Sequence, residues 1–512
     1  MKKKINLKFQ KKVRLCYDPF FYFGNFKTKK HMRLLKISII FILTLSLTSC
    51  FEDRDDNVIA ASEINDFVWK GMNAVYLYKD EIPDLANDRF STNEEYGAYL
   101  NSFSDPQDLF NSLIYMPETV DRFSRLIPNY IEFEQQLAGT SKSNGLEFNL
   151  YLEPGSDTEV FGVIRLVLNN SVASSLGLQR GQIFDAVNGT QLNTSNLNSL
   201  LGQDTYTLNF ANYNDNGTTA VEDDTITSTT NSQSLTKEVY TENPVHLTSI
   251  INVGGENVGY LVYNGFTSNF NSQLNDAFAT FQANTVQHLV LDLRYNPGGS
   301  VLTASYLGSM ITGQFTGDVY SKLFYNNNLQ SNNRDFQFVN NIDGSPINSL
   351  NLNKVYILTT SRSASASELV INSLNPYIEV VLIGDITTGK TQASSTIYDS
   401  PELFNKDGVN PNHTYAMQPL IANSVNVNEA LVPSTGLIPD ITLIESPRNF
   451  GTLGDINEPL LAAALADIEG LGRFSRQEIE FRAIKSDINL KPFEEGMYID
   501  NSDLIINRLQ LK

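Results

Sequence analysis

The chain has 512 residues, enough for about three domains. Its net charge is −20, and the first 49 residues carry 12 of the 37 Lys and Arg residues but only one of the 57 acidic residues, so the rest has a net charge of −31. So acidic a body excludes nucleic acid as the expected partner. Two cysteines imply no disulfide framework, and four histidines offer no metal-binding pattern. We therefore expect neither a metal nor a cofactor.

Residues 1–49 have the pattern of a targeting leader, with translation starting at Met1 or at Met32. The apolar run Ile37 to Leu47 is too short for a typical membrane span and ends in Leu-Thr-Ser-Cys50, which resembles the lipobox of bacterial lipoproteins. The resemblance implies a lipid on Cys50 and an acidic linker over 50–56, similar to the export signal of Bacteroidetes lipoproteins. We expect an outer-membrane lipoprotein of the cell envelope, periplasmic or surface-exposed; an ordinary signal peptide is the alternative.

Residues 57–138 predict an N-terminal helical domain. Apolar residues recur at three-to-four spacing from Ala61 to Trp69 and again from Pro117 to Leu137, which predicts two amphipathic helices. No residue pattern in this domain indicates chemistry.

Residues 139–242 change to short strands and predict a β domain. The loop formed by Gly145, Leu146, Glu147 and Phe148 resembles the carboxylate-binding loop of PDZ domains, and Ser171 to Gly189 resembles their helix–turn–strand segment. In such a loop successive N–H groups face a C-terminal carboxylate, while an open strand edge pairs with the peptide. An ordinary β-hairpin module is the alternative. The polar stretch 212–234 predicts a surface loop.

Residues 243–445 alternate strand and helix, which predicts an α/β domain with a parallel-rich sheet. Strands are expected at 258–263, 288–293, 354–360 and 378–384, and helices at 269–281, 302–311 and 365–374. The final stretch, 446–512, is expected to be a helical extension, with its helix over 459–471.

Two polar groups follow neighbouring strands of this domain. Ser365 opens a helix after the strand 354–360, and Lys390 follows the strand 378–384. Parallel strands would bring both to one edge of the sheet, where the helix N-terminus favours developing negative charge. A lysine acts as a base only in its neutral form, so we expect apolar surroundings for Lys390. Ser365 and Glu368 also fit a capping box, in which the serine only caps the N-terminus of a helix.

Three motifs, in order, resemble the C-terminal processing peptidases (tail-specific proteases, family S41). They are Asp292-Leu-Arg-Tyr-Asn-Pro-Gly-Gly299, Ser363-Ala-Ser-Ala-Ser-Glu368 and Gly389-Lys390. The resemblance implies a crotonase-like ββα superhelix, with an inserted or preceding PDZ domain and an N-terminal helical cap. It also implies a serine endopeptidase that acts on unfolded proteins or exposed C-termini.

The same resemblance assigns roles to residues. Ser365 would be the nucleophile and Lys390 the base, and the N–H groups of Ala366 and of Gly298 or Gly299 would form the oxyanion hole. Many members carry a glutamine four residues after the lysine; here Gln392 lies two residues on and Ser394 occupies that position, so Gln392 is the candidate to orient the lysine.

Other functions are weighed against this one. A histidine could replace the lysine as base, with His246, His288 and His413 as candidates. The stretch Gly384 to Thr391 matches a P-loop, but the residues after it predict no helix to complete a phosphate site. A catalytically inactive PDZ-type lipoprotein that binds peptides is the alternative from another class. The sequence does not determine the oligomeric state.

Overall fold

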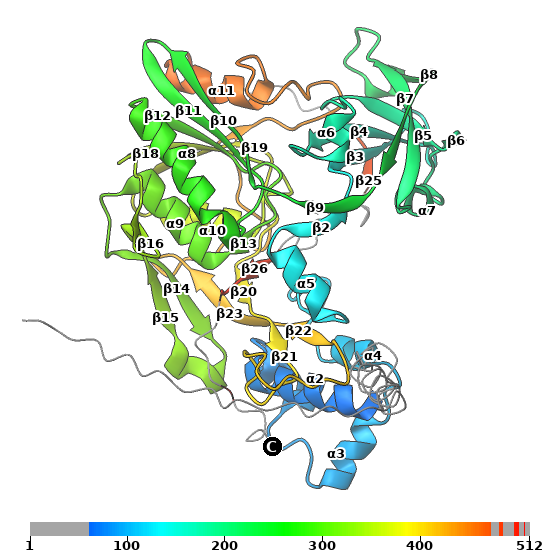
Figure 1. Ribbon diagram of the computed structural model, residues 1–512, viewed down its shortest axis with the longest axis vertical. Helices are drawn as coiled ribbons and strands as arrows, with labels where there is room; N and C mark the ends of the chain where they lie inside the picture. Colours follow the sequence, from blue (N-terminus) through cyan, green and yellow to red (C-terminus); the bar gives the residue numbers. More distant parts are fainter. Residues whose placement is uncertain (1–60, 473–480, 485–495, 501–505, 507–512) are drawn as a thin grey trace, which may run out of the picture. The chain divides into compact units, whose positions relative to one another are not determined.

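The computed structural model describes residues 61–472, 481–484, 496–500 and 506, and the described residues belong to one compact unit (Figure 1). The leader, the acidic linker and Cys50 lie outside the described residues, so the expectations for them stay predictions. No helix among the described residues is both long and apolar enough to cross a membrane.

The N-terminal region contains the helices α2 (Ala61–Val75), α3 (Asn93–Leu100), α4 (Pro106–Ser112) and α5 (Tyr130–Leu137). The prediction of one helix from 117 to 137 is wrong. Pro128 disfavours a helical conformation at Ile127, which instead ends the short strand β1 (Arg125–Ile127). Helix α5 begins only after Asn129, whose side chain accepts hydrogen bonds from the N–H groups of Ile131 and Glu132.

A six-stranded sheet forms the centre of the α/β region, in the order β10-β11-β12-β18-β19-β24. Its strands are β10 (Val245–Val253), β11 (Glu256–Tyr263), β12 (His288–Asp292), β18 (Lys354–Thr359), β19 (Glu379–Gly384) and β24 (Ile441–Thr442). Strands β10 and β11 are antiparallel and every other pair is parallel. The predicted parallel-rich sheet and its four expected strands are therefore confirmed.

Both faces of this sheet are buried, which explains why its strands are apolar without alternation. Val290, Leu358 and Ile383 belong to the cluster that packs against α11 (Pro459–Ile468). Leu291 and Ile357, one position away, face the cluster that includes α8 (Asn271–Ala283), α9 (Val301–Thr312) and α10 (Ala366–Leu374). The three helices expected from spacing are thus confirmed.

A second six-stranded sheet, β13-β26-β20-β23-β14-β15, adjoins the helices of the first. Its strands are β13 (Gly299–Ser300), β26 (Met497–Tyr498), β20 (Gln392–Ser394), β23 (Leu420–Val425), β14 (Val319–Tyr325) and β15 (Arg334–Gln337). Strand β1 of the N-terminal region pairs with β22 (Ala416–Gln418), which pairs with β21 (Ile397–Tyr398). The N-terminal region is therefore joined to the α/β region by main-chain pairing.

The β domain is a separate sheet with the order β25-β3-β4-β5-β7-β8, with β6 (Thr190–Gln191) paired to β5. Its principal strands are β3 (Leu146–Leu152), β4 (Val160–Val167), β5 (Ile183–Val187), β7 (Thr205–Asn214) and β8 (Thr225–Thr236), with the short helices α6 (Val172–Ser175) and α7 (Leu197–Leu201). Strands β2 (Thr140–Ser143) and β9 (Glu238–Thr241) pair where the chain enters and leaves it.

The surface loop predicted at 212–234 is confirmed only for 215–224; the residues on either side belong to the long hairpin of β7 and β8. Its Thr and Ser residues occupy an exposed sheet surface, and the hydroxyls of Thr207 and Ser234 lie 2.7 Å apart across the strands. Threonine is β-branched and suits such a half-exposed strand, although its polarity resembles that of a loop.

The C-terminal stretch is not simply helical. Helix α11 ends at Ile468, and the later described residues form the short strands β25 (Ala483–Ile484) and β26. Strand β25 joins the β domain, whereas β26 lies between β13 and β20. Two-residue strands have too little periodicity to be found from sequence.

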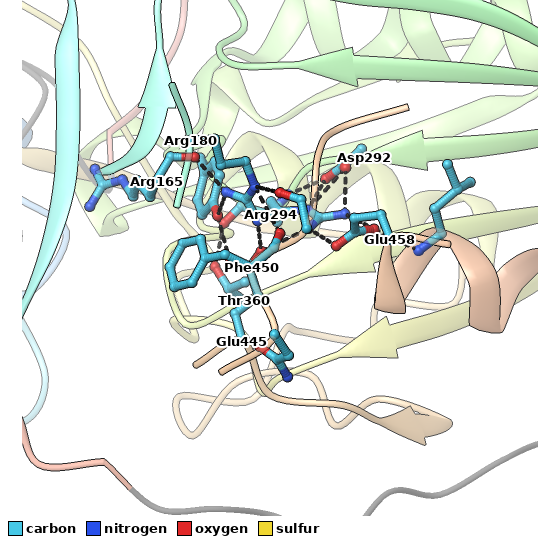
Figure 2. A network of polar contacts seen from close by, with 12 residues as sticks. Arg165, Arg180, Asp292, Arg294, Thr360, Glu445, Phe450 and Glu458 are labelled. Carbon is cyan, nitrogen blue, oxygen red and sulfur yellow. Dashed lines mark hydrogen bonds and ion pairs between the residues drawn. The ribbon is translucent and has the colours of Figure 1, made fainter. Parts of the chain in front are cut away.

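A buried ionic network connects the β domain with the strand that leads to the glycine turn (Figure 2). Arg294, which is fully buried, donates to Asp292 at 2.9 Å and to Glu458 and Glu445 at 2.7 Å each. Arg180 of the β domain pairs with the same Glu445, whose other oxygen accepts from Tyr295 at 2.6 Å. The network therefore fixes the residues immediately before Gly298 and Gly299.

This network predicts a loss of stability in acid. Burial alone would raise the pKa of Glu445, but the guanidinium groups of Arg180 and Arg294 hold it at about 2. An unfolded glutamate titrates near ~4.3, so ionised Glu445 contributes about 3 kcal/mol above ~pH 5, and this is lost as the pH falls toward 2. Urea unfolding should show Glu445→Gln to be less stable than the native chain at pH 6, with a smaller difference at pH 3.

The control for this comparison is Glu132→Gln, an exposed glutamate on α5. It should leave the change in the free energy of unfolding between pH 6 and pH 3 the same as in the native chain. An equal loss at pH 6 and pH 3 in Glu445→Gln would contradict the assigned ionic role.

Candidate active site

Ser365 lies in the sharp turn between β18 and α10, with φ 64° and ψ −111°. This is strained for a residue with a side chain. Ser300, which caps α9, is the useful comparison: it has φ −63° and ψ 125°, and its hydroxyl accepts the N–H of Thr303 at 3.0 Å. The Ser365 turn has the outline of a capping box, but its hydroxyl is buried without a well-formed hydrogen bond to any described residue. Ser365 thus differs from an ordinary helix cap.

The Glu368 carboxylate joins the serine turn to the lysine loop. Its Oε2 accepts the N–H of Ser365 at 2.8 Å and the N–H of Lys390 at 2.9 Å. Its Oε1 accepts the N–H of Gly389 at 2.7 Å and the hydroxyl of Thr387 at 2.5 Å. Burial raises the pKa of Glu368, and these four hydrogen bonds oppose that rise. Because one carboxylate oxygen accepts both N–H groups, the main-chain nitrogens of Ser365 and Lys390 lie within about 6 Å of each other.

Lys390 is buried, and its side-chain nitrogen lies 4.6 Å from the ring centroid of Phe123. Arg122, the preceding residue, donates to the carbonyls of Thr388 and Gly389 at 3.2 Å each. The N-terminal region therefore covers the lysine with an aromatic ring and holds the loop that carries it. The residue pattern of the N-terminal region gave no sign of these contacts.

The glycine turn lies against the serine. A Cβ atom at Gly298 would lie 2.7 Å from the Cβ of Ser365, and the φ angles of Gly298 and Gly299 are 113° and 134°. Only glycine fits a position with both constraints. The N–H of Gly298 donates to Asn296 Oδ1 at 3.0 Å, and the carbonyl of Asn296 accepts the Ser367 hydroxyl at 2.9 Å. The turn is thus bonded to the loop that carries Ser365, and its oxyanion role, shared with the N–H of Ala366, stays a prediction.

Gln392 contacts the N-terminal region. Its side-chain amide donates to the hydroxyl of Tyr78 at 2.9 Å, and its Oε1 is buried with no hydrogen-bond partner among the described residues. Ser394, at the position where relatives carry glutamine, donates to the carbonyl of Met497 at 2.8 Å. An orienting contact from Gln392 to Lys390 stays a prediction.

Two of the three histidine alternatives, His413 and His288, are engaged elsewhere. His413 Nε2 lies 2.8 Å from Asp399, and its Nδ1 accepts the N–H of Tyr415 at 3.1 Å, so both ring nitrogens are occupied. His288 Nε2 lies 2.6 Å from Glu256 at the far end of β12 from the glycine turn. These contacts favour Lys390 over these two histidines as the base for Ser365.

The loop predicted to bind a carboxylate is held by its own neighbours. The N–H groups of Gly145 and Leu146 donate to Ser143 Oγ at 2.9 Å and to Asn144 Oδ1 at 3.1 Å. Leu146 and Phe148 are in the core of the β domain, and Glu147 forms a buried ion pair with Arg165 at 3.2 Å. Two N–H groups of the predicted carboxylate site are therefore hydrogen-bonded within the loop, and carboxylate binding there stays a prediction.

A cavity of about 300 Å³ connects this loop with the glycine turn. Asn144, Leu146 and Phe148 line it from the β domain, and Gly298 and Gly299 line it from the α/β region. The two predicted functional elements thus face one space.

Comparisons with known proteins agree with this geometry. Residues 257–414 match the family model described as peptidase family S41, and residues 63–125 match that of the peptidase S41 N-terminal domain. Two regions of the chain are therefore similar to peptidase family S41. The first match includes the glycine turn, Ser365 and Lys390, and the second includes Arg122 and Phe123. Metal-ligating side chains do not gather in groups of three or more within the described part of the chain.

Individual relatives show how far the similarity extends. A carboxyl-terminal-processing protease of Picosynechococcus is 25% identical over 239 residues, covering 47% of this chain and 51% of its own. A CtpA-like serine protease of Staphylococcus epidermidis is 27% identical over 155 residues, covering 30% of this chain and 29% of its own. The chain therefore spans about half or less of these curated relatives.

A solved structure gives broader coverage. The crystal structure of a protein of Bacteroides fragilis assigned to the S41 proteases is 28% identical, with a TM-score of 0.64. It covers 79% of this chain and 97% of the Bacteroides chain. The mixed α/β architecture is thus that of an S41 peptidase.

The geometry predicts that Glu368 positions both Ser365 and Lys390. In Glu368→Gln the side chain keeps its size, but an NH₂ group must face two of the four donors, so the serine and lysine loops should separate. We expect hydrolysis of an unfolded protein such as casein to fall about 100-fold, since misplacement by about 1 Å has such effects. Glu379→Gln, an exposed glutamate on β19, is the control and should keep full activity.

The fold of each variant is checked by circular dichroism and thermal unfolding. Native-like casein hydrolysis by a folded Glu368→Gln variant would show that this carboxylate does not position the site.

Proposed function

We propose that the protein is a serine endopeptidase with a Ser365–Lys390 dyad. The observation that carries the proposal is Ser365 itself, a buried and strained serine whose hydroxyl lacks a well-formed hydrogen bond, at a helix N-terminus and against a glycine turn. Such strain costs on the order of 1–3 kcal/mol, and it clusters at active sites. Glu368 brings the lysine loop to the same place.

The proposed reaction uses these residues in turn. Ser365 Oγ attacks the peptide carbonyl and gives its proton to the neutral amine of Lys390, which then passes the proton to the leaving amine. The N–H of Ala366 and one N–H of the Gly298–Gly299 turn stabilise the oxyanion, with each donor contributing about 3 kcal/mol in other acyl-transfer enzymes. Water then attacks the acyl-enzyme, Lys390 accepts its proton, and Ser365 is regenerated.

We further propose that the β domain is a PDZ domain that binds substrate C-termini, and that the α/β region is a crotonase-like ββα superhelix. The cavity shared by the 144–148 loop and the glycine turn supports a link between recognition and cleavage. We also propose that the chain is anchored in the cell envelope by a lipid on Cys50, facing the periplasm or the outside. Unfolded proteins of that compartment are then the proposed substrates.

The alternative is an inactive peptide-binding lipoprotein. The observation that favours it is the departure at Gln392, which binds Tyr78. Mutation separates this alternative from the peptidase, because a protein that only binds peptides needs neither Ser365 nor Lys390.

The dyad predicts that Ser365→Ala and Lys390→Ala each reduce casein hydrolysis at least about 1,000-fold, because removing either member of such a pair removes most of its effect. Ser195→Ala and Lys322→Ala, which alter side chains away from the site, are matched controls and should keep native rates. Rates are followed with fluorescently labelled casein.

Three results separate the possibilities. Hydrolysis that survives Lys390→Ala would refute the lysine as base. Hydrolysis that survives both active-site substitutions would refute the dyad. A native chain that binds C-terminal peptides without cutting casein would establish the inactive binder.

A further inference from the structure

One edge of the β-domain sheet is occupied by the chain's own C-terminal segment. Strand β3 pairs along its whole length with β4 on one side, and β25 pairs with its other side at Leu150 and Tyr151 (Figure 1). Without β25, β3 would be an edge strand of this sheet, and an unpaired edge is where an extended peptide adds a strand.

The direction of β25 is the one that a bound C-terminus requires. Ala483 pairs antiparallel with Tyr151 and Ile484 with Leu150, and the N–H of Leu152 donates to the carbonyl of Arg482 at 2.9 Å. The segment therefore runs along β3 toward its first residue, Leu146, beside the predicted carboxylate loop. A peptide that placed its terminal carboxylate at that loop and paired with β3 would run the same way.

The side chains of the segment also fill peptide-like positions. Ile484 packs against the core cluster of the β domain, which contains Leu146, Phe148 and Leu150. Phe481, three residues earlier and so on the opposite face of the strand, contacts Tyr151 with ring centroids 5.8 Å apart. Apolar side chains thus anchor the segment as alternate pockets anchor a peptide.

The segment is held by few contacts. Its pairing with β3 covers two residues, and Phe481 and Ile484 are only partly buried. Its ion pair joins Arg482 to Asp157 at 2.6 Å, but the two side chains are 51% and 91% exposed. Exposed ion pairs contribute little, so an incoming strand with equal apolar contacts can replace the segment.

We propose that residues 481–484 are a tethered occupant of the peptide-binding edge of β3, which a substrate's C-terminal strand must displace. The proposal rests on the proposed PDZ recognition and adds a regulatory element to it. Because the segment is part of the same chain, it competes at a high effective concentration. The apparent Kd for substrate then equals the intrinsic Kd divided by the fraction of molecules in which the edge is free. The protein then binds only C-termini that pair better than Phe-Arg-Ala-Ile.

The first experiment weakens the segment. In a Ser365→Ala background, which prevents cleavage, a fluorescein-labelled decapeptide with a free C-terminal valine is titrated by fluorescence anisotropy. Adding Phe481→Ala and Ile484→Ser should lower its Kd about 3- to 10-fold, because the competitor is weakened. Val239→Ser is the control, since it removes an 80% exposed apolar side chain from another strand, β9. An unchanged or higher Kd in the double variant would overturn the proposal.

The second experiment locks the segment and is reversible. Tyr151→Cys with Ala483→Cys places two thiols on directly paired residues, whose spacing suits a disulfide, and Cys16→Ser and Cys50→Ser prevent other pairings. Peptide affinity should fall at least 10-fold on oxidation and return on reduction, so the protein is its own folding control. Equal affinity in both states would overturn the proposal.

These experiments distinguish failure of the tethered occupant from failure of peptide recognition and of the dyad. Peptide binding that does not occur in any form, or that is equal for the C-terminally amidated peptide, refutes carboxylate recognition and the tethered occupant together. Casein hydrolysis by the native chain tests the dyad independently of both results.

Discussion

The buried carboxylate of Glu368 is the constraint on which the site depends. It takes four donors from three positions of one loop and from the main chain of Ser365, and so places the serine turn and the lysine loop within hydrogen-bonding reach of one side chain. Ser365 and Lys390 lie in the segments that follow two neighbouring parallel strands, and they come together only if both segments are held in place. In this protein Glu368 fixes both turns: its two buried oxygens accept four hydrogen bonds, which offset the cost of burying the carboxyl group.

The rest of the molecule supports this turn from several directions. The buried network around Arg294 holds the strand that ends in the glycine turn, and hydrogen bonds from Ala364 and Ser367 to the Asn296 carbonyl join that turn to Ser365. The N-terminal region adds Phe123 over the lysine and Arg122 on its loop. Arg180 of the β domain reaches the same network through Glu445, so the proposed recognition domain and the proposed catalytic turn share one set of buried charges.

Much of the α/β region could be predicted from sequence, because buried parallel strands are continuous apolar runs and because glycines and a serine at strand ends mark sharp turns. The strands β12, β18 and β19 and the helices α8, α9 and α10 were predictable for this reason. The hairpin β7–β8 was missed because its threonines are as polar as a loop. Phe123 and Arg122 could not be assigned, since they lie more than 260 residues from the loop they hold and no local pattern records that contact. Glu368 was visible only as half of a capping box, and its bonds to Gly389 and Lys390 depend on the folded chain.

The measurement that tests the central claim most directly is covalent labelling of the serine. The native chain is incubated with a fluorophosphonate, which reacts with activated serine hydroxyls, and the labelled peptide is identified by mass spectrometry. If Lys390 activates Ser365, the adduct should form on Ser365 and should form at least about 100 times more slowly in Lys390→Ala, with Lys322→Ala labelling at the native rate. An adduct on another residue, or equal labelling rates with and without Lys390, would contradict the dyad.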